Sequence, residues 1–202
     1  MSAQPHVPVF DIGGVLIDWD PRHLYRKIFT DTDRMEWFLS EICTPDWNES
    51  IDAGRTFDDA ISDRIAAWPD WATEIVAWRD RWPEMVAGPI HGTVDLLERL
   101  QSRGPVFAIT NFGAESIDWA IRDYPFLSRF DGMIVSGRVG MIKPDPAIYQ
   151  ALLDTHGLDP ASCFFIDDRA DNVEAARDVG FHAVRFQDPE TLETDLASHG
   201  LL

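Results

Sequence analysis

Acidic side chains end two short apolar runs in this sequence. Asp11 follows VPVF, and Asp167 and Asp168 follow CFFI. Clustered carboxylates repel one another unless a cation neutralises them, and oxygen ligands with few histidines favour Mg²⁺ over zinc. A carboxylate can also attack phosphorus or the carbon of an alkyl halide. The acids therefore suit cation binding and nucleophilic chemistry.

Other residues complement these acids. Thr110 and Asn111 follow the run PVFAI, and Lys143 follows GMIV through a loop. A lysine and a hydroxyl can stabilise charge on transferring oxygens. Gly13 and Gly14 allow the backbone to approach an anion closely. Each residue alone has an ordinary interpretation, such as a turn, a helix cap or a surface lysine. It is the ordered set, with each member after a strand, that indicates a functional site.

The positions of these residues depend on the predicted elements. Unalternated apolar runs are typical of strands in a parallel sheet that is covered on both faces. Helical patterns separate them, and a glycine follows the last turn of each, which is a common helix stop. Ligands of such sheets bind beyond the carboxyl ends of the strands. The predicted strands are VPVF, PVFAI, GMIV, CFFI and HAV, and the predicted helices between them are 93–103, 144–156 and 171–179.

The stretch from residue 21 to residue 89 differs from the rest. It has no strand-like run, and together with Trp19 it holds seven of the eight tryptophans. We predict helices near 22–29, 33–43, 56–67 and 69–82, inserted after the first strand. Four large apolar side chains share one face of the last helix, and this pattern favours packing within the insertion, with a partner surface as the alternative. They are Trp71, Ile75, Trp78 and Trp82.

Composition limits the function classes. The net charge of −18, from 35 acids against 17 Lys and Arg, disfavours binding to nucleic acid or to anionic membranes. Cys43 and Cys163 form no ligand spacing or disulfide framework, which favours a reducing compartment. The polar start MSAQPHVP is unlike a signal peptide. We predict a cytoplasmic protein.

The ordered motifs resemble those of the haloacid dehalogenase-like (HAD) hydrolase superfamily over essentially the whole chain. VFDIGGVLIDWDP is similar to the nucleophile motif, FAITNFG to the second, GMIKPDPAIYQALL to the third and CFFIDDRADNVEAARDVGFHAV to the fourth. The helical insertion resembles the small cap of this family. The branch that looks most similar is that of bacterial sugar-phosphate phosphatases resembling glucose-1-phosphate phosphatase.

The resemblance implies a role for each motif residue. Asp11 would attack phosphorus and form an aspartyl-phosphate. Thr110 and Lys143 would hold the phosphoryl oxygens, with Gly14 and Asn111 in substrate binding. Mg²⁺ would be held by Asp11, the Gly13 carbonyl and Asp168, with Asp167 orienting metal-bound water.

Gly13 departs from the family pattern, because most phosphatases of the superfamily have a second aspartate there as general acid and base. Asn48, Glu49 and Asp52 lie in a polar stretch of the cap, DWNESIDAG, and are candidates to reach the site. Asp18 and Asp20 are also close in sequence, but we expect them to shape the turn into the cap.

Two alternatives remain at this point. Haloacid dehalogenases also lack that second aspartate and use no metal, but an aspartate of their fourth motif activates water, and Asn172 stands at the matching position here. The second alternative is a catalytically weak binding module that uses its Trp-rich cap as a contact surface.

We therefore predict an α/β fold: a doubly wound, mostly parallel sheet of Rossmann type with a small helical cap. Residues 1–20 and 89–202 would form the core domain and 21–88 the cap domain. The predicted activity is Mg²⁺-dependent hydrolysis of a small phosphorylated metabolite, a sugar phosphate in particular. The Trp-rich cap is a candidate homodimer surface.

Overall fold

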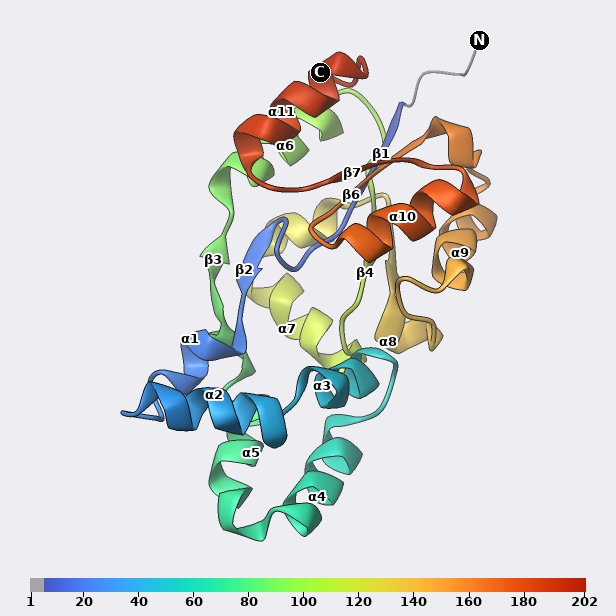
Figure 1. The fold of residues 1–202 in the computed structure, drawn as a ribbon. Coiled ribbons are helices and arrows are strands. Elements are labelled where there is room, and N and C mark those ends of the chain that lie inside the picture. Colours follow the sequence, from blue (N-terminus) through green and yellow to red (C-terminus); the bar gives the residue numbers. More distant parts are fainter. Residues whose placement is uncertain (1–5) are drawn as a thin grey trace.

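The computed structural model describes residues 6–202 and is built around one five-stranded parallel sheet (Figure 1). The strand order is β5-β4-β1-β6-β7, so each predicted strand is confirmed. These strands are apolar without alternation because helices cover both faces of the parallel sheet. The strands are β1 (Val7–Phe10), β4 (Phe107–Thr110), β5 (Gly132–Val135), β6 (Cys163–Asp167) and β7 (His182–Arg185).

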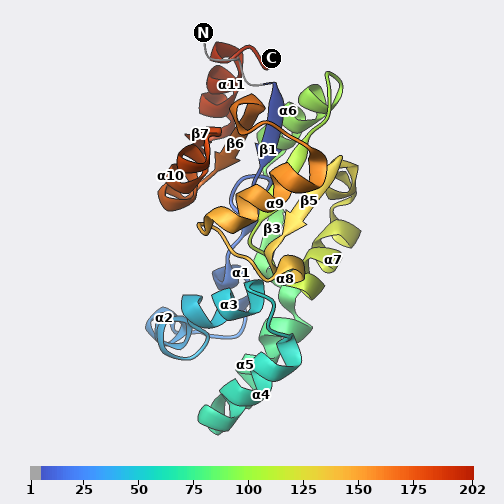
Figure 2. The ribbon, with the colours of Figure 1, turned by 90° about the vertical axis from the view of Figure 1, so that its right-hand side faces the viewer.

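Helices pack on the two faces of this sheet (Figures 1 and 2). One face packs against α6 (His91–Gln101), α7 (Ala114–Asp123) and α11 (Pro189–Ser198). The other packs against α9 (Pro146–His156) and α10 (Ala170–Val179). The doubly wound α/β fold is therefore confirmed. The remaining short helix of this part is α8 (Ser136–Val139).

The glycine stops are confirmed for two of the three predicted helices. Gly157 and Gly180 follow α9 and α10 with φ of 64° and 108°, a left-handed conformation that favours glycine. The prediction was wrong for Gly104, since α6 ends at Gln101 and Ser102 forms its cap. The sequence pattern also missed α7 and α11.

Residues 21–88, here called the cap segment, form a cluster of helices at one end of the sheet (Figure 1). They are α1 (Pro21–Tyr25), α2 (Thr32–Glu41), α3 (Pro45–Asp52), α4 (Phe57–Ala67) and α5 (Ala72–Asp80). The helix α3 was missed, because only Trp47 and Ile51 carry its apolar periodicity. The division of the chain into a core domain and a cap domain stays a prediction.

The prediction of one continuous helix over 69–82 was wrong. A 3₁₀ turn (Pro69–Trp71), α5 and a second 3₁₀ turn (Trp82–Met85) replace it. Trp78 and Trp82 are nevertheless 1% and 3% exposed, because they pack inward. Burial of these side chains agrees with the packing interpretation of the stripe.

Two further strands join the cap segment to the sheet. The strand β2 (Ile17–Trp19) pairs antiparallel with β3 (Val86–Pro89), and Ile17 lies opposite Pro89. The expectation that residues 21–89 hold no strand was therefore wrong at β3. Its sequence, VAGP, hides the strand because Gly and Pro are rare in strand interiors.

None of the described helices is long and apolar enough to span a membrane.

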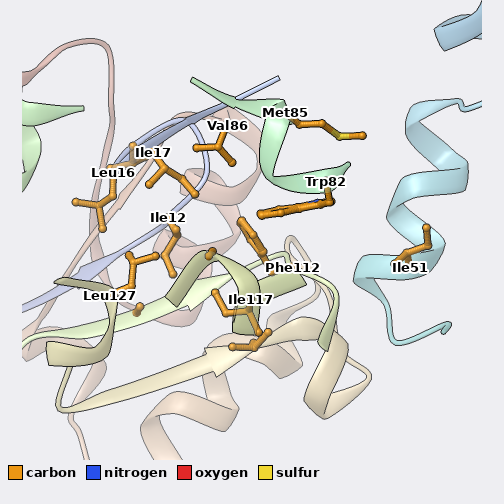
Figure 3. Packing of buried hydrophobic residues seen from close by; sticks show 14 of the residues in the cluster. Ile12, Leu16, Ile17, Ile51, Trp82, Met85, Val86, Phe112, Ile117 and Leu127 are labelled. Atoms are coloured by element: carbon orange, nitrogen blue, oxygen red, sulfur yellow. The ribbon is translucent and has the colours of Figure 1, made fainter. Parts of the chain in front are cut away.

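Apolar contacts join the cap segment to the sheet and its helices. The rings of Trp82 and Phe112 lie with centroids 5.8 Å apart in a T-shaped contact. Figure 3 shows this pair beside Ile12 and Ile117, with Ile51 of α3 across from them. One continuous hydrophobic cluster therefore runs from the cap helices to one face of the sheet.

Candidate functional site

The carboxyl ends of three adjacent strands gather the predicted site residues. The order β4-β1-β6 places Thr110, Asp11 and Asp167 at one edge of the sheet. Asp11 directly follows β1, and its backbone N–H donates to the carbonyl of Ile166 on β6. Sheet pairing thus fixes the distance between the acidic strand ends.

Lys143 lies at the centre of this edge and is 1% exposed. Its Nζ lies 2.9 Å from Asp11 Oδ1 and 2.7 Å from Asp167 Oδ2, and donates to the Ile109 carbonyl at 3.0 Å. Burial lowers the pKa of Lys143, but the charges of Asp11 and Asp167 outweigh burial and raise it. The side chain is therefore a fixed cation.

Asp167 is completely buried and its oxygens are fully engaged. Besides Lys143, the Asn172 amide donates to both of its carboxylate oxygens at 3.0 Å, and the Arg169 backbone N–H donates to Oδ1 at 2.9 Å. A carboxylate with so many donors is held in one orientation. Asp167 does not line the cavity described below.

Asp11 shares the single positive charge of Lys143 with Asp167, so its own charge is only partly compensated. Burial raises its pKa to about 7, Lys143 opposes this shift, and the charge of Asp167 adds to it. Burial and the same neighbour also raise the pKa of Asp168. Oxygen atoms of Asp11, Asp167 and Asp168 lie within 4.8 Å of one another. Three hard oxygen donors this close together fit a divalent cation such as Mg²⁺.

Gly14 makes room for one of these acids. Its φ is +73°, and a Cβ atom there would lie 2.8 Å from Asp168 Oδ2. Its backbone N–H donates to the Ile17 carbonyl at 2.9 Å, so this amide is already used within the loop. A Cβ atom at Gly13 would meet only Phe112, at 3.6 Å. Substrate binding by Gly14 stays a prediction.

The last residue of β4 and the first residue after it are two predicted binding residues. Thr110 Oγ1 is buried and has no hydrogen-bond partner. Asn111 lines the cavity, and its amide donates to the Lys143 carbonyl and accepts from the Lys143 N–H, at 3.0 and 2.9 Å. Asn111 therefore fixes the backbone that presents the lysine.

A cavity of about 440 Å³ opens above this edge. Asp11, Lys143 and Asp168 contribute to its sheet side, and helices of the cap segment form the opposite wall. That wall is rich in aromatic and other apolar side chains. They include Leu39, Phe57, Trp78 and Trp82, and Trp19 of β2 lies beside them in the lining.

The three polar cap candidates all line the cavity: Asn48, Glu49 and Asp52. They lie on α3, the helix that sequence periodicity missed, although Thr44 as N-cap and Pro45 in the first turn were available signals. By contrast, Asp18 contacts His23, and Asp20 accepts from the Arg22 N–H as the N-cap of α1. These last two shape the turn into the cap, as predicted.

Comparisons with known proteins agree with this geometry. A family model described as haloacid dehalogenase-like hydrolase matches residues 7–180. The sesquiterpene phosphatase astK of Aspergillus oryzae is 26% identical, over 89% of each chain. A bifunctional epoxide hydrolase 2 from Sus scrofa is 40% identical over 67 residues, but the match spans only 12% of that protein.

Solved structures share the fold. A predicted HAD-like family hydrolase from Porphyromonas gingivalis superposes with a TM-score of 0.76 at 20% identity, over 97% of this chain and 98% of that one. A HAD family enzyme from Bacteroides thetaiotaomicron, in complex with magnesium and inorganic phosphate, superposes with a TM-score of 0.70 at 22% identity. The match covers 91% of this chain and 95% of that one.

Proposed function

The chain belongs to the haloacid dehalogenase-like hydrolases, and we propose that it is a Mg²⁺-dependent phosphomonoester hydrolase that works through an aspartyl-phosphate on Asp11. It is a hydrolase of this family, and its relatives favour a phosphatase over a dehalogenase. The observation that carries the proposal is the cluster of Asp11, Asp167 and Asp168, in which the first two are buried and contact Lys143.

The nucleophile of this reaction is Asp11. Of the two carboxylates that contact Lys143, Asp11 lines the cavity and Asp167 does not. Asp11 Oδ1 faces Lys143 Nζ and accepts from the Ile12 N–H at 2.7 Å, so the carboxylate is oriented before substrate arrives. Lys143 and the unpartnered hydroxyl of Thr110 are suited to hold phosphoryl oxygens.

The donor set fits Mg²⁺, which Asp11, Asp168 and the Gly13 carbonyl would hold, with Asp167 behind them. When bound, the ion neutralises the carboxylates and the negative charge on the transferring phosphoryl group. Asp167, fixed by Lys143 and Asn172, keeps the lysine in position whether or not the ion is present.

The substrate is a small phosphorylated metabolite, and sugar phosphates are the first class to test. The aromatic cap wall favours a second class, phosphomonoesters whose leaving group carries an apolar part, because apolar lining binds apolar surface. The relative astK is named a sesquiterpene phosphatase, which supports including this class.

A dehalogenase is the weaker alternative. Its water-activating acid would stand at position 172, where this chain has an amide that donates to Asp167. An amide cannot accept a proton from water at neutral pH. The paired acids Asp167 and Asp168 also have little use in a displacement at carbon that needs no metal.

Purified protein tests the function directly. Phosphate release from sugar phosphates and from apolar phosphomonoesters is measured beside halide release from chloroacetate and 2-chloropropionate, with and without EDTA. We expect phosphate release that EDTA abolishes and Mg²⁺ restores. Halide release that EDTA does not change would contradict the proposal.

We also propose a cytoplasmic location without nucleic-acid or membrane partners. Cys43 and Cys163 are both free and buried, as a reducing compartment allows. A homodimer through the Trp-rich cap stays a proposal; Trp37, 40% exposed, is available for it. Size-exclusion chromatography of Trp37→Ala beside the wild type tests the dimer.

A further inference from the structure

Gly13 leaves the proposed reaction without a proton donor on the sheet side of the cavity. Departure of an alkoxide from phosphorus is slow unless its oxygen gains a proton, and general acid catalysis contributes about 10²–10⁴-fold. Lys143 is bound to two carboxylates and to a carbonyl, so it serves as a fixed charge. The donor must therefore come from elsewhere on the cavity wall.

Asp52 is held over the site from the cap side. It is the last residue of α3, half-buried, and lines the same cavity as Asp11. The Asn48 amide, one turn earlier, donates to Asp52 Oδ2 at 2.8 Å. This bond orients the carboxyl group.

Close backbone packing fixes the end of α3 against the loop after β4. A Cβ atom at Gly113 would lie 3.1 Å from Ile51 Cγ2. A Cβ atom at Gly54 would lie 3.3 Å from the Gly137 carbonyl, and Gly54 has a φ of +108°. The loop after β4, which carries Asn111, and the helix α8 thus also support the helix end that carries Asp52.

The surroundings of Asp52 favour its neutral, proton-bearing form. Burial raises the pKa of Asp52 well above its usual value, and the charges of Glu49 and Asp11 act in the same direction. Hydrogen bonding from the Gly113 backbone and from Asn48 opposes this rise without cancelling it. Of the other polar groups of α3 in this lining, Glu49 is exposed and Asn48 has an amide, which is no proton donor at neutral pH.

We propose that Asp52 is the general acid and base of this enzyme, delivered by the cap segment in place of the acid absent at Gly13. The inference rests on the proposed phosphatase function. When Asp11 attacks, the phosphorus–oxygen bond to the leaving group breaks, its electron pair stays on that oxygen, and the Asp52 carboxyl proton joins it. Asp52 is then a carboxylate.

The second half-reaction returns the proton. Water attacks the phosphorus of the aspartyl-phosphate, and the Asp52 carboxylate accepts a proton from this water. The bond between phosphorus and Asp11 breaks, and its electron pair restores the Asp11 carboxylate. Inorganic phosphate leaves, and both residues regain their starting protonation.

The test compares two esters that differ in their need for a proton. The leaving group of p-nitrophenyl phosphate departs readily as an anion, whereas that of phenyl phosphate does so far less readily. For Asp52→Asn we expect kcat/KM to fall about 10²–10³-fold with phenyl phosphate and less than about tenfold with p-nitrophenyl phosphate. Asp46→Asn, on the exposed first turn of the same helix and outside the cavity, should change neither value by more than about twofold.

An equal loss with both esters would overturn the inference, because it would mean that Asp52 only supports the cap. Melting temperatures report whether each variant folds, and Asp52→Ser provides a second removal of the carboxyl if Asp52→Asn is unstable. Gly13→Asp in the Asp52→Asn background should recover phenyl phosphate hydrolysis at least tenfold, since position 13 has room.

The two proposals fail in different ways. If the wild type releases no phosphate from any ester, the phosphatase function fails and the role of Asp52 falls with it. If the wild type is active and Asp11→Asn is not, but Asp52→Asn keeps the wild-type ratio between the two esters, only the role of Asp52 is wrong.

Discussion

The two sides of the cavity hold their charges in different ways. On the sheet side, Asp11 and Asp167 share the buried ammonium group of Lys143. In the cap segment, ion pairs such as Lys27–Glu84 are exposed, and Asp52, which lines the cavity, has an amide as its side-chain partner. A charge fixed by two partners suits binding of a phosphoryl group, whereas an acid without a cationic partner suits proton transfer.

The largest effect is expected at Asp11. Asp11→Asn keeps the size of the side chain but removes the nucleophile, so we expect phosphate release to fall by at least about 10³-fold. The fold should remain, because the change removes a carboxylate whose burial raises its pKa to about 7. Circular dichroism and a phosphate assay check both points. Substantial remaining activity would assign the nucleophile to another group.

Substitution of Lys143 and of Lys27 compares how much the buried ion pairs of the sheet side and an exposed ion pair of the cap segment contribute to stability. Lys143→Met leaves two buried carboxylates without their cation, so we expect the free energy of unfolding to fall by about 3–5 kcal/mol. Lys27→Met breaks an exposed pair with Glu84, so we expect a change of about 0–1 kcal/mol. Urea denaturation measures both. Similar losses of unfolding free energy in the two variants would mean that the buried and the exposed ion pairs do not differ in their contribution to stability.

Substitution of the neighbouring glycines Gly13 and Gly14 tests whether the position of Asp168 matters for metal binding. Gly14→Ala places a Cβ atom against Asp168 and forces a left-handed conformation on alanine, at a cost of roughly 1–2 kcal/mol. Displacement of Asp168 should also raise the Mg²⁺ concentration needed for half-maximal activity. Gly13→Ala has ordinary contact distances and is the control. Equal Mg²⁺ titrations for the two variants would argue against Asp168 as a ligand.

The two regions should also respond oppositely to pH. The folded-state pKa of Asp11 is raised from 3.8 to about 7, so its contribution to stability is full below pH 3.8 and is lost as the pH rises through 7. The pKa of Glu84 is lowered from 4.5 to about 2 by Arg81 and then Lys27, so its contribution exists above pH 4.5 and is lost as the pH falls through 2.

Thermal denaturation in EDTA, followed from pH 4 to pH 8, measures the sheet-side effect. We expect the metal-free protein to lose stability across this range, since the pKa values of Asp52 and Asp168 are raised as well. Mg²⁺ should stabilise the protein most at the alkaline end. Asp11→Asn should flatten the profile. A metal-free profile that rises with pH would contradict the raised pKa values.

The sheet side could be predicted from sequence because its signals are local. Asp11, Thr110 and Asp167 each end a short apolar strand, and parallel pairing brings strand ends together. Lys143 is harder, because a lysine after a loop has no local sign of burial. The ordered motifs, rather than the residue itself, predicted its position.

The cap side could be predicted only in part. The helix α3 has two apolar residues in its repeat, and Asp52 is one of the 35 acidic residues of the chain. The contact between Ile51 and Gly113 joins residues 62 positions apart in sequence, and no local pattern encodes it. Similarly, β3 forms because β2 lies beside it, against the preference of its Gly and Pro.

The β2–β3 ribbon has a consequence for how this chain can change over evolutionary time. Because Ile17 lies opposite Pro89, the chain leaves the sheet and returns to it at one point, and the intervening helices need only start and finish there. Insertions at such closely spaced ends are well tolerated. The specificity of the enzyme can therefore diverge by exchange or growth of this one segment, while the five-stranded sheet and its charges are inherited unchanged.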